Sequence, residues 1–401
     1  MKYRYADRID AFGRSPIREV LKLASDPSVI SFAAGNPSPN SFPAKNFREI
    51  ADKLLSEQPE KILQYGVSEG YAPLQAAIRK RMSVKYQSCG ADDGILITSG
   101  AQQAIESFAK CFLNEGDGVI CENPSFISSL NAIRSYNGGR LFGIPVESDG
   151  MDLDALERTL QTEKNIKFIY TISTFQNPTG RTLSLEKRKR MLELAKKYHV
   201  LILEDSPYFE LCYSGDHIPT LKSLDTDGIV AFAGSLSKIL APGMRVGFLI
   251  APSEVIKHVT KCKQISDVHT NTLAQAIAYE YLTCYDIDQH IRDLCSMYRD
   301  SRDTMVDALK GIDERVRFTP PDGGLFLWCE MPEKYSANEL QNRIWEAGKV
   351  LFISGPAFSV APGQFSNCFR LNFSMPTKEN ICKGIDIIKD CLTEYLHEGS
   401  R

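Results

Sequence analysis

The sequence lacks long hydrophobic segments. Its 401 residues contain no apolar run as long as the ~18 residues that a helix needs to cross a bilayer. Residues 1–14 carry several charges and no apolar stretch, which is unlike a secretory signal. We therefore predict a cytoplasmic protein that does not bind a membrane.

The sequence also lacks the spacings that are typical of metal sites. None of its 11 cysteines forms a C-x-x-C pair, and none of its six histidines forms an H-x-x-x-H pair or lies beside a cysteine pair. Cysteine- and histidine-based metal sites are recognised by such patterns. We predict no metal site and interpret the cysteines as reduced, buried thiols of a cytoplasmic protein.

The chain has no large excess of positive or negative charge. The formal net charge is −3, which gives no electrostatic case for a nucleic-acid partner. Internal repeats and low-complexity segments are absent as well. At roughly 100–200 residues per domain, the length indicates two or three structural units.

The chain does contain short apolar runs that alternate with helical patterns. The runs are residues 94–98, 118–122, 167–173, 200–205, 229–234 and 245–251, and helical patterns such as residues 101–113 and 184–198 lie between several of them. This alternation favours a mostly parallel sheet covered by helices on both faces. We predict an α/β large domain over residues 45–285, with a mostly parallel seven-stranded sheet between helices.

The remaining segments predict a smaller α+β domain. Residues 286–401 mix helical patterns with strand-like stretches around residues 325–331 and 367–374. Residues 1–44 hold one short helical pattern, at residues 15–24, followed by a stretch rich in Gly, Pro and Asn. That segment is too short for a domain, and we expect this N-terminal arm to join the small domain.

Polar or aromatic residues follow five of the predicted strands. They lie at residues 99–103, 123–126, 174–180, 205–208 and 235–238. In open α/β sheets, ligands bind outside the carboxyl ends of the strands. The five segments together therefore predict one binding site at this edge of the sheet.

The segment Ser235-Leu-Ser-Lys238, followed by Arg245, indicates the chemistry of that site. A lysine amine forms an imine with an aldehyde, and pyridoxal phosphate is an aldehyde that acts as an electron sink when its ring nitrogen is protonated. Lys238 offers the amine, and Ser235, Ser237 and Arg245 offer donors to a phosphate. Asp205 ends a wholly apolar strand, where an unpaired charge would be costly, and a pyridinium partner would explain it.

Two further segments complete this hypothesis. The turn at residues 99–103 precedes a helix, whose free N–H groups favour an anion. Phe126, which follows the sequence Glu-Asn-Pro-Ser, can supply a stacking face for the ring. Each feature also has an ordinary explanation, as a surface charge, a helix cap or a turn residue.

Taken together and in this order, the segments resemble a known family. Residues 64–78, 99–103, 174–180, 204–208, 235–247, 321–328 and 369–374 are similar to the motifs of fold-type-I pyridoxal-phosphate aminotransferases of class I and II. The resemblance covers nearly the whole chain. It is strongest to the branch that contains 2-aminoadipate, kynurenine and aromatic aminotransferases.

The resemblance implies a role for each matching cofactor residue. Lys238 matches the lysine that forms the imine and shuttles the α-proton, and Asp205 matches the carboxylate on the ring nitrogen. Asn177 and Tyr208 match donors to the phenolic oxygen. The phosphate cradle matches Gly100, Ala101, Gln102, Ser235, Ser237 and Arg245, with Tyr65 lent by the neighbouring subunit of a homodimer.

The resemblance also implies substrate contacts. Arg370 matches the arginine that binds the substrate α-carboxylate, with Asn177 and Gly35 nearby. Arg18 is our candidate for the second carboxylate of an acidic substrate. Two departures from the family pattern are Phe126, where a stacking tyrosine is common, and residues 355–358 (Gly-Pro-Ala-Phe), which replace the usual Pro-Gly loop.

The predicted function is therefore an aminotransferase. It would move the α-amino group of 2-aminoadipate, an aromatic amino acid or other donors to a 2-oxo acid such as 2-oxoglutarate, by a ping-pong mechanism through an imine at Lys238. One alternative is a pyridoxal-phosphate-dependent lyase or decarboxylase on the same fold. Another is a ligand-sensing regulator module, which would require a basic DNA-binding domain.

Overall fold

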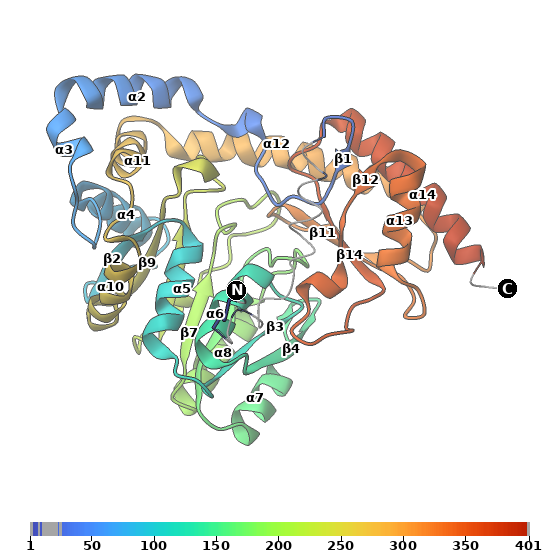
Figure 1. Cartoon of the computed structure of the whole chain (residues 1–401), viewed down its shortest axis with the longest axis horizontal. Helices are drawn as coiled ribbons and strands as arrows, with labels where there is room; N and C mark the ends of the chain where they lie inside the picture. The colour runs from blue at the N-terminus through green and yellow to red at the C-terminus, as the bar shows by residue number, and fades with distance from the viewer. Residues whose placement is uncertain (1–2, 7–8, 10–22, 24–25, 399–401) are drawn as a thin grey trace.

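A computed structural model of the chain describes residues 3–6, 9, 23 and 26–398 (Figure 1). Arg18 and almost all of the helix predicted at residues 15–24 lie outside the described residues. In the part of the chain that is described, no helix is both long and apolar enough to cross a membrane.

The described residues build an eight-stranded sheet around which the large part of the molecule is organised. Its strand order is β2-β9-β8-β7-β6-β3-β4-β5. The strands are β2 (Asp93–Thr98), β3 (Gly118–Asn123), β4 (Leu141–Glu147), β5 (Gly150–Met151), β6 (Ile166–Thr171), β7 (Leu201–Asp205), β8 (Val230–Ser235) and β9 (Gly247–Pro252). Strand β9 is antiparallel to β2 and β8, and β5 is antiparallel to β4; the other neighbours are parallel. The predicted mostly parallel sheet is confirmed, with the two-residue β5 as an eighth strand.

Two layers of apolar side chains cover the two faces of this sheet. On one face, Ile120, Ile169 and Ile202 pack with side chains from α7 (Leu153–Thr162) and α8 (Leu185–Lys197). On the other face, strand side chains such as Tyr170 and Leu203 join the cluster that includes α5 (Ala101–Phe112) and α6 (Ile127–Asn137). Because side chains alternate along a strand, each central strand contributes to both layers, which explains its nearly continuous apolar sequence.

Further helices pack around this core, as Figure 1 shows. Helix α10 (Ser253–Asp267) packs against α5 and β2, and α11 (Thr272–Cys284) packs against α2 (Ala44–Glu57) and α4 (Ala72–Val84). The short helices α3 (Pro59–Leu63) and α9 (Leu221–Leu224) and the 3₁₀ turns η2 (Pro39–Ser41) and η3 (Pro242–Met244) complete this region. Beyond it begins the long helix α12 (Ile287–Ala308).

A second, antiparallel sheet lies in the C-terminal part. Its order is β10-β11-β14-β13, formed by β10 (Arg317–Phe318), β11 (Phe326–Glu330), β13 (Ile353–Ser354) and β14 (Cys368–Asn372). The long helix α12 packs on α14 (Lys378–Glu398), which also packs on α13 (Ala337–Gly348). The 3₁₀ turn η4 (Gly355–Phe358) connects β13 towards β14.

The N-terminal arm joins this C-terminal part through a small parallel sheet. Strand β1 (Ile30–Ser31) pairs with β12 (Val350–Leu351), and the Phe32 carbonyl accepts a hydrogen bond from the Asn372 N–H. The contact agrees with the expected place of the arm. The domain boundaries at residues 44 and 285 stay a prediction.

Candidate active site

A cavity of about 260 Å³ opens at the carboxyl ends of the central strands. It is lined by Asn36, Ala101, Gln102, Ile105, Phe126, Ile172, Asn177, Asp205, Pro207, Tyr208, Ser235, Ser237, Lys238, Pro242 and Arg245. All of these residues except Asn36, which lies in the N-terminal arm, follow β2, β3, β6, β7 and β8, the five strands whose ends were singled out in the sequence. Strand order therefore brings segments that are more than 100 residues apart to one place.

Lys238 lies just beyond the end of β8, half-buried at the cavity wall. Its Nζ donates a hydrogen bond of 2.7 Å to the Gly35 carbonyl and lies 5.9 Å from the centre of the Tyr208 ring. Burial, together with the charges of Arg370 and Arg245, lowers the pKa of Lys238 to about 8. A lysine with such a pKa is partly neutral near pH 8, and the neutral amine is the form that attacks a carbonyl.

Asp205 ends β7 and is buried in the cavity floor. The Tyr170 hydroxyl donates a hydrogen bond of 2.8 Å to its Oδ2, but its Oδ1 receives no hydrogen bond from any described residue. Burial raises the pKa of Asp205 to about 7, against the Tyr170 donor that lowers it and with a further contribution from the charge of Glu122. A buried carboxylate with one oxygen free is suited to receive a cationic N–H group.

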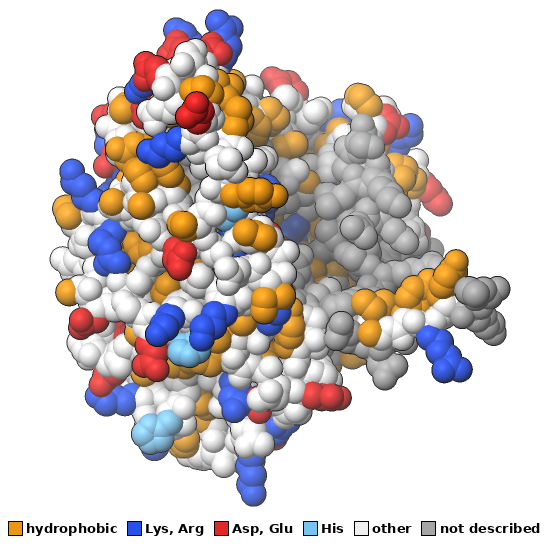
Figure 2. All heavy atoms as spheres, turned by 60° about the vertical axis from the view of Figure 1, so that its left-hand side comes forward, with side chains coloured by type: hydrophobic (Ala, Val, Ile, Leu, Met, Phe, Trp, Pro, Cys, Tyr) orange, Lys and Arg blue, Asp and Glu red, His pale blue; other side chains and the backbone are white. Residues whose placement is uncertain are grey.

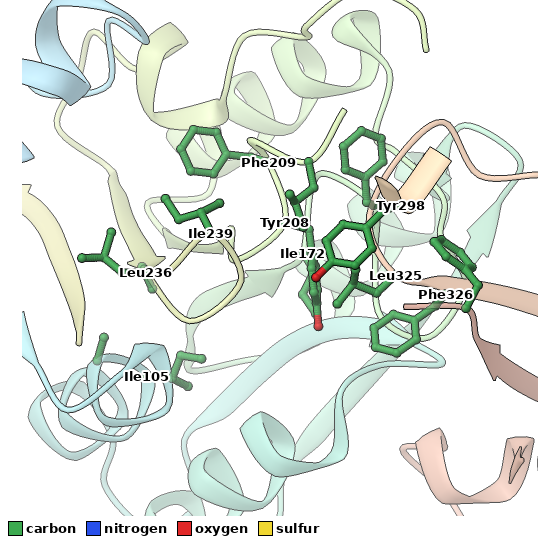
Figure 3. Close-up of a cluster of buried hydrophobic side chains, with 14 of the residues drawn as sticks. Ile105, Ile172, Tyr208, Phe209, Leu236, Ile239, Tyr298, Leu325 and Phe326 are labelled. Atoms are coloured by element: carbon green, nitrogen blue, oxygen red, sulfur yellow. The ribbon is translucent and has the colours of Figure 1, made fainter. Parts of the chain in front are cut away.

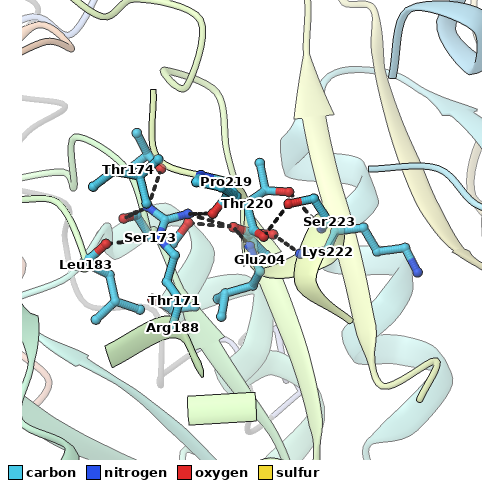
Figure 4. Close-up of polar contacts among 12 residues, drawn as sticks. Thr171, Ser173, Thr174, Leu183, Arg188, Glu204, Pro219, Thr220, Lys222 and Ser223 are labelled. Atoms are coloured by element: carbon cyan, nitrogen blue, oxygen red, sulfur yellow. Dashed lines mark hydrogen bonds and ion pairs between the residues drawn. The ribbon is translucent and has the colours of Figure 1, made fainter. Parts of the chain in front are cut away.

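The adjacent Glu204 points to the opposite face of the sheet, where both of its oxygens accept hydrogen bonds (Figure 4). Its Oε1 accepts from the Ser173 hydroxyl at 2.6 Å and the Leu221 N–H at 2.9 Å, and its Oε2 accepts from the Lys222 N–H at 2.9 Å. The guanidinium of Arg188, also fully buried, lies 3.7 Å from Oε1. This carboxylate is part of the framework that fixes the end of β7.

Residues 99–103, at the start of α5, form a turn that is suited to an anion, and we call this segment the anion-binding turn. Gly100 occupies the N-cap position with φ +82°, and within the described chain no side chain caps this helix end. A Cβ atom at Gly100 would lie 2.1 Å from Nη2 of Arg245, and one at Gly247 would lie 2.6 Å from the Gly100 carbonyl carbon. Glycine at both positions therefore lets Arg245 and the helix N-terminus approach the same point, where N–H groups favour an anion.

The serines of β8 and Arg245 meet beside this turn. The Ser235 and Ser237 hydroxyls are 3.0 Å apart, and Arg245 Nη1 lies 3.4 Å from the Ser237 hydroxyl. Arg245 itself has φ +52° and donates from Nη2 to the Ser99 carbonyl at 3.0 Å. The structure thus brings the predicted cradle residues together, with Ala101 and Gln102 in the first turn of α5.

Phe126 lies half-buried in the cavity wall, where it precedes the first residue of α6. It has no hydroxyl, so it can offer only a ring face. Gln102 lines the cavity as well, but its Nε2 donates to the Ser128 carbonyl at 3.0 Å.

Arg370, on β14 of the second sheet, reaches the same region from the other side. Its Nη1 donates to Asn177 Oδ1 at 2.7 Å and its Nη2 donates to the Ala33 carbonyl at 2.6 Å. Its Nε is buried without a hydrogen-bond partner in the described chain. Burial lowers the pKa of Arg370 to about 10, so the side chain stays cationic at neutral pH and keeps an unused donor.

Two aromatic rings enclose this guanidinium. Arg370 Cζ lies 4.1 Å from the centre of the Phe326 ring and 4.8 Å from that of Phe358. Phe326 in turn meets Tyr208 edge to face at 5.7 Å, within the apolar cluster of Figure 3. Gly35 approaches from the arm, where a Cβ atom would lie 2.8 Å from Phe326 Cζ.

Two predicted cofactor residues, Gly100 and Tyr65, do not line the cavity; Gly100 lies beside it at the start of α5, whereas Tyr65 lies elsewhere on the chain. Tyr65 is 82% exposed, and its ring contacts His269 edge to face at 5.8 Å. It does not line the cavity of its own chain. Arg18, the other distant candidate, lies outside the described residues.

Sequence reasoning missed three residues that shape the site. Tyr170 holds Asp205 from within the apolar run of β6, Phe358 covers Arg370 from η4, and Asn36 lines the cavity. Phe358 falls in the loop that departs from the family pattern, which was the one available signal. The other two lie in segments whose sequence is typical of a strand and of a turn.

Cavity size alone does not identify the site. A larger cavity of about 580 Å³ lies beside Arg181 and Glu330, and one of about 300 Å³ lies beside Cys212 and His217. Neither is lined by the lysine, the free carboxylate oxygen or the anion-binding turn. The chemistry of the lining side chains therefore decides the assignment.

Comparison with known proteins agrees with this chemistry. The family model named "Aminotransferase class I and II" matches residues 27–388. The chain belongs to this aminotransferase family.

Similar family members cover almost all of both chains. An aromatic-amino-acid aminotransferase from Thermococcus litoralis is 37% identical over 387 residues, which span 95% of this chain and 92% of the relative. The crystal structure of a multiple substrate aminotransferase from Thermococcus profundus has a TM-score of 0.93 and 36% identity, with 98% of both chains covered. An α-aminoadipate aminotransferase from Thermus thermophilus, complexed with N-(5′-phosphopyridoxyl)-L-leucine, has a TM-score of 0.90 and 34% identity over 98% of both chains.

Family membership implies pyridoxal phosphate, and the side chains fit it. The free Oδ1 of Asp205, the amine of Lys238 and the uncapped start of α5 in the described chain are the three features that such a cofactor requires. Together they can receive a ring N–H, an aldehyde and a phosphate.

Proposed function

We propose that this aminotransferase binds pyridoxal phosphate at Lys238 and transfers the α-amino group of an amino acid to a 2-oxo acid. The observation that carries this proposal is the buried Asp205 oxygen, which has no partner among the described residues. Leaving such an acceptor unpaired costs about 1–3 kcal/mol. A ring N–H at this place would remove that cost.

The remaining cofactor contacts follow from the geometry of the cavity. Gly100 and Ala101 would offer N–H groups to the phosphate, and Ser235, Ser237 and Arg245 would add two hydroxyls and a charge. Asn177 and Tyr208 line the cavity beside Lys238, where they would donate to the phenolic oxygen, and Phe126 would stack on the ring. When bound, pyridoxal phosphate supplies an aldehyde that condenses with amines and a cationic ring that accepts an electron pair.

Lys238 has two tasks in this proposal. Its amine, with the lowered pKa of about 8, holds the cofactor between turnovers. When it is not bound to the cofactor, the Lys238 amine would be the base that takes the proton from the substrate α-carbon and returns it. Asp205 would hold a proton on the ring nitrogen of the bound cofactor.

Arg370 would bind the substrate α-carboxylate. Planar guanidinium and carboxylate groups match in two parallel hydrogen bonds, and the buried Nε, which has no partner in the described chain, is one available donor. Asn177 holds the guanidinium in place, and Gly35 would approach the substrate with its backbone. Because the described residues offer one such carboxylate site, at Arg370, donor and acceptor would use it in turn, which favours a ping-pong mechanism.

The range of substrates is drawn from the similar proteins. The names of these proteins refer to aromatic amino acids, α-aminoadipate and multiple substrates. We propose 2-aminoadipate and aromatic amino acids as donors and 2-oxoglutarate as acceptor. Arg18 stays our candidate for the second carboxylate of acidic substrates.

The active unit would be a homodimer with shared sites. Exposed apolar side chains gather on the side of the molecule that carries α2–α4 and α10, which Figure 2 brings forward; they include Leu63, Tyr65, Val67 and Val268. A second copy that covers this side could receive Tyr65 at its phosphate. We place this dimer in the cytoplasm, where its cysteines, all free thiols in the described chain, would stay reduced.

A half-reaction assay tests the proposal. Purified protein loaded with pyridoxal phosphate is mixed with single amino acids, and the visible absorbance of the bound cofactor is recorded. We expect 2-aminoadipate and aromatic amino acids to bleach it, and 2-oxoglutarate to restore it with formation of glutamate. Release of ammonia or carbon dioxide without an acceptor would instead identify a lyase or decarboxylase.

A further inference from the structure

Asp267, at the end of α10, lies behind the anion-binding turn and outside the cavity. Its Oδ2 accepts hydrogen bonds from the Ser99 hydroxyl at 3.0 Å and from Gln103 Nε2 at 2.7 Å. Its Oδ1 accepts from Lys263 Nζ at 2.5 Å. Three donors therefore converge on one carboxylate that no part of the proposed mechanism uses.

The two donors to Oδ2 come from the two ends of the turn. Ser99 precedes the N-cap Gly100, and Gln103 lies in the first turn of α5. A fourth hydrogen bond, from the Ser99 N–H to Gln103 Oε1 at 2.7 Å, closes the loop between them. Asp267 thus fixes the spacing of the segment whose N–H groups would bind the phosphate in the proposed function.

The same segment positions Arg245. Its Nη2 donates to the Ser99 carbonyl at 3.0 Å, so the orientation of Ser99 also sets the orientation of the guanidinium. A shift of the turn would displace the helix N–H groups and Arg245 together. Asp267 therefore acts on both parts of the cradle through one residue.

Lys263 compensates for the charge of Asp267. A lone carboxylate behind a phosphate site would repel the anion, but the Lys263 side chain is fully buried and ion-paired with Asp267. Burial opposes ionisation of Asp267, while the Lys263, Gln103 and Ser99 donors outweigh it and hold the pKa of Asp267 below its usual value. The pair supplies fixed hydrogen-bond acceptors with little net charge.

The backbone directly after Asp267 is strained, and the turn that it makes adds a further contact to Ser99. Val268 has φ +64° and ψ −60°, a region that β-branched residues rarely adopt. The turn brings the Thr270 hydroxyl to 3.3 Å from the Ser99 hydroxyl. Strain of this kind persists where the surrounding contacts require it and is common at functional sites.

We propose that Asp267, with its charge balanced by Lys263, is a positioning residue that shapes the turn at residues 99–103 for a phosphate group. The proposal rests on the proposed function for the identity of the phosphate carrier. It predicts an effect on the phosphate end of the cofactor only. Contacts of the ring and the aldehyde, made by Asp205 and Lys238, should not change.

The test compares two ligands of full-length protein by equilibrium dialysis after removal of bound cofactor. Pyridoxal phosphate probes the whole site, and pyridoxal, which lacks the phosphate, probes the ring and aldehyde contacts alone. Asp267→Ala should lower the affinity for pyridoxal phosphate by about ten- to hundredfold, because charge-assisted hydrogen bonds are lost. It should change the affinity for pyridoxal by less than about twofold. Ser99→Ala is a milder change that removes one hydroxyl, and it should lower the affinity for pyridoxal phosphate by about two- to tenfold.

Ser266→Ala is the matched control. Ser266 neighbours Asp267 and also accepts a hydrogen bond across the same helix pair, from Lys110 Nζ at 3.3 Å, but it does not touch the turn. Ser266→Ala should therefore leave the affinity for both ligands within about twofold of the wild-type value.

A double variant separates positioning from general destabilisation. In Asp267→Asn the amide oxygen can still accept from Ser99 and Gln103, but the amide N–H₂ faces the buried ammonium of Lys263. Adding Lys263→Met removes that conflict, so the double variant should regain most of the pyridoxal phosphate affinity. Asp267→Ala combined with Lys263→Met should not regain it, because no acceptor remains.

Each outcome is decisive. Three results would overturn the positioning role. They are equal losses of affinity for pyridoxal and pyridoxal phosphate in Asp267→Ala, an affinity for pyridoxal phosphate that Asp267→Ala does not change, and equal recovery of that affinity in both double variants. Wild-type protein that binds neither ligand would overturn the proposed function and, with it, this inference.

Discussion

Glu204 and Asp205 are neighbours on β7, yet they show opposite hydrogen-bonding states. Both are buried at the end of one strand and point to opposite faces of the sheet. Glu204 receives three hydrogen bonds and an ion pair with Arg188. Asp205 receives one, from Tyr170, and its Oδ1 has no partner in the described part of the chain.

The difference separates a structural carboxylate from a functional one. Removing a buried charge whose oxygens both accept hydrogen bonds leaves its partners unpaired and destabilises the fold. A buried charge with a free oxygen destabilises the protein until a ligand occupies it. Changes on the Glu204 face should therefore affect stability, and changes on the Asp205 face should affect cofactor binding and turnover.

The largest effect is expected on the Asp205 face, from Lys238→Ala. Removing the group that we propose to move the α-proton should lower turnover by about a thousandfold or more. The unfolding free energy of the cofactor-free protein should not decrease, because Lys238 buries a charge that makes one hydrogen bond. Borohydride reduction of the wild-type protein followed by peptide mapping checks the assignment, and a label on another lysine would contradict it.

Glu204→Gln should produce the opposite pattern. Breaking the buried pair with Arg188 should lower the unfolding free energy by about 3–5 kcal/mol, measured by urea denaturation, while the folded protein keeps its turnover within about twofold. Glu186, whose ion pair with Lys189 is exposed, offers the control. Glu186→Gln should lower the unfolding free energy by less than about 1 kcal/mol. A stable but inactive Glu204→Gln would remove the distinction between the two faces.

The pH dependence of stability tests the cost of burying Asp205. Its carboxyl has a pKa of about 7 in the folded protein, against 3.8 as the ordinary value. Between these values the unfolded chain releases a proton that the folded protein retains, so stability is lost as the pH rises through this window. Cofactor-free wild type should lose up to about 4 kcal/mol relative to Asp205→Asn between about pH 4 and pH 7.

Saturating pyridoxal phosphate should reduce this loss, because a ring cation would compensate for the charge. Parallel pH profiles of cofactor-free wild type and Asp205→Asn would contradict the predicted burial cost.

Tyr170→Phe should give a smaller effect on the same face. Loss of a donor to a charged acceptor costs about 1.5–3 kcal/mol, and the cost should appear above pH 7, where Asp205 is ionised. Tyr298 is an equally buried tyrosine that accepts from the neutral Ser38 N–H, so Tyr298→Phe should show no such pH dependence. Equal pH profiles for the two variants would contradict the role of Tyr170.

Much of the fold could be predicted because the central strands are buried on both faces. The six apolar runs became β2, β3, β6, β7, β8 and β9. Strand β4 was not among them, since Gly143 and Pro145 interrupt its apolar pattern. It lies next to the edge of the sheet, where proline is tolerated.

The site could be predicted only where a short motif carries its chemistry. Asp205 is the last residue of β7 and Lys238 lies three residues after the end of β8, and parallel strands bring such ends together. The hydrogen bond from Tyr170 depends on the register of β6 and β7, and the contact of Phe358 with Arg370 joins two segments through the tertiary fold. Asp267 was missed because its sequence, at the end of an ordinary helix, carries no motif.

The central claim is that Asp205 holds a proton on the ring nitrogen of bound pyridoxal phosphate, and ¹⁵N NMR of the ring-labelled cofactor measures this directly. In the wild-type protein the ring nitrogen should have the chemical shift of the protonated form from about pH 6 to pH 8.5. In Asp205→Asn it should have that of the unprotonated form, and α-proton removal should slow by about a hundred- to thousandfold. The same ring-nitrogen shift in both proteins would contradict the account.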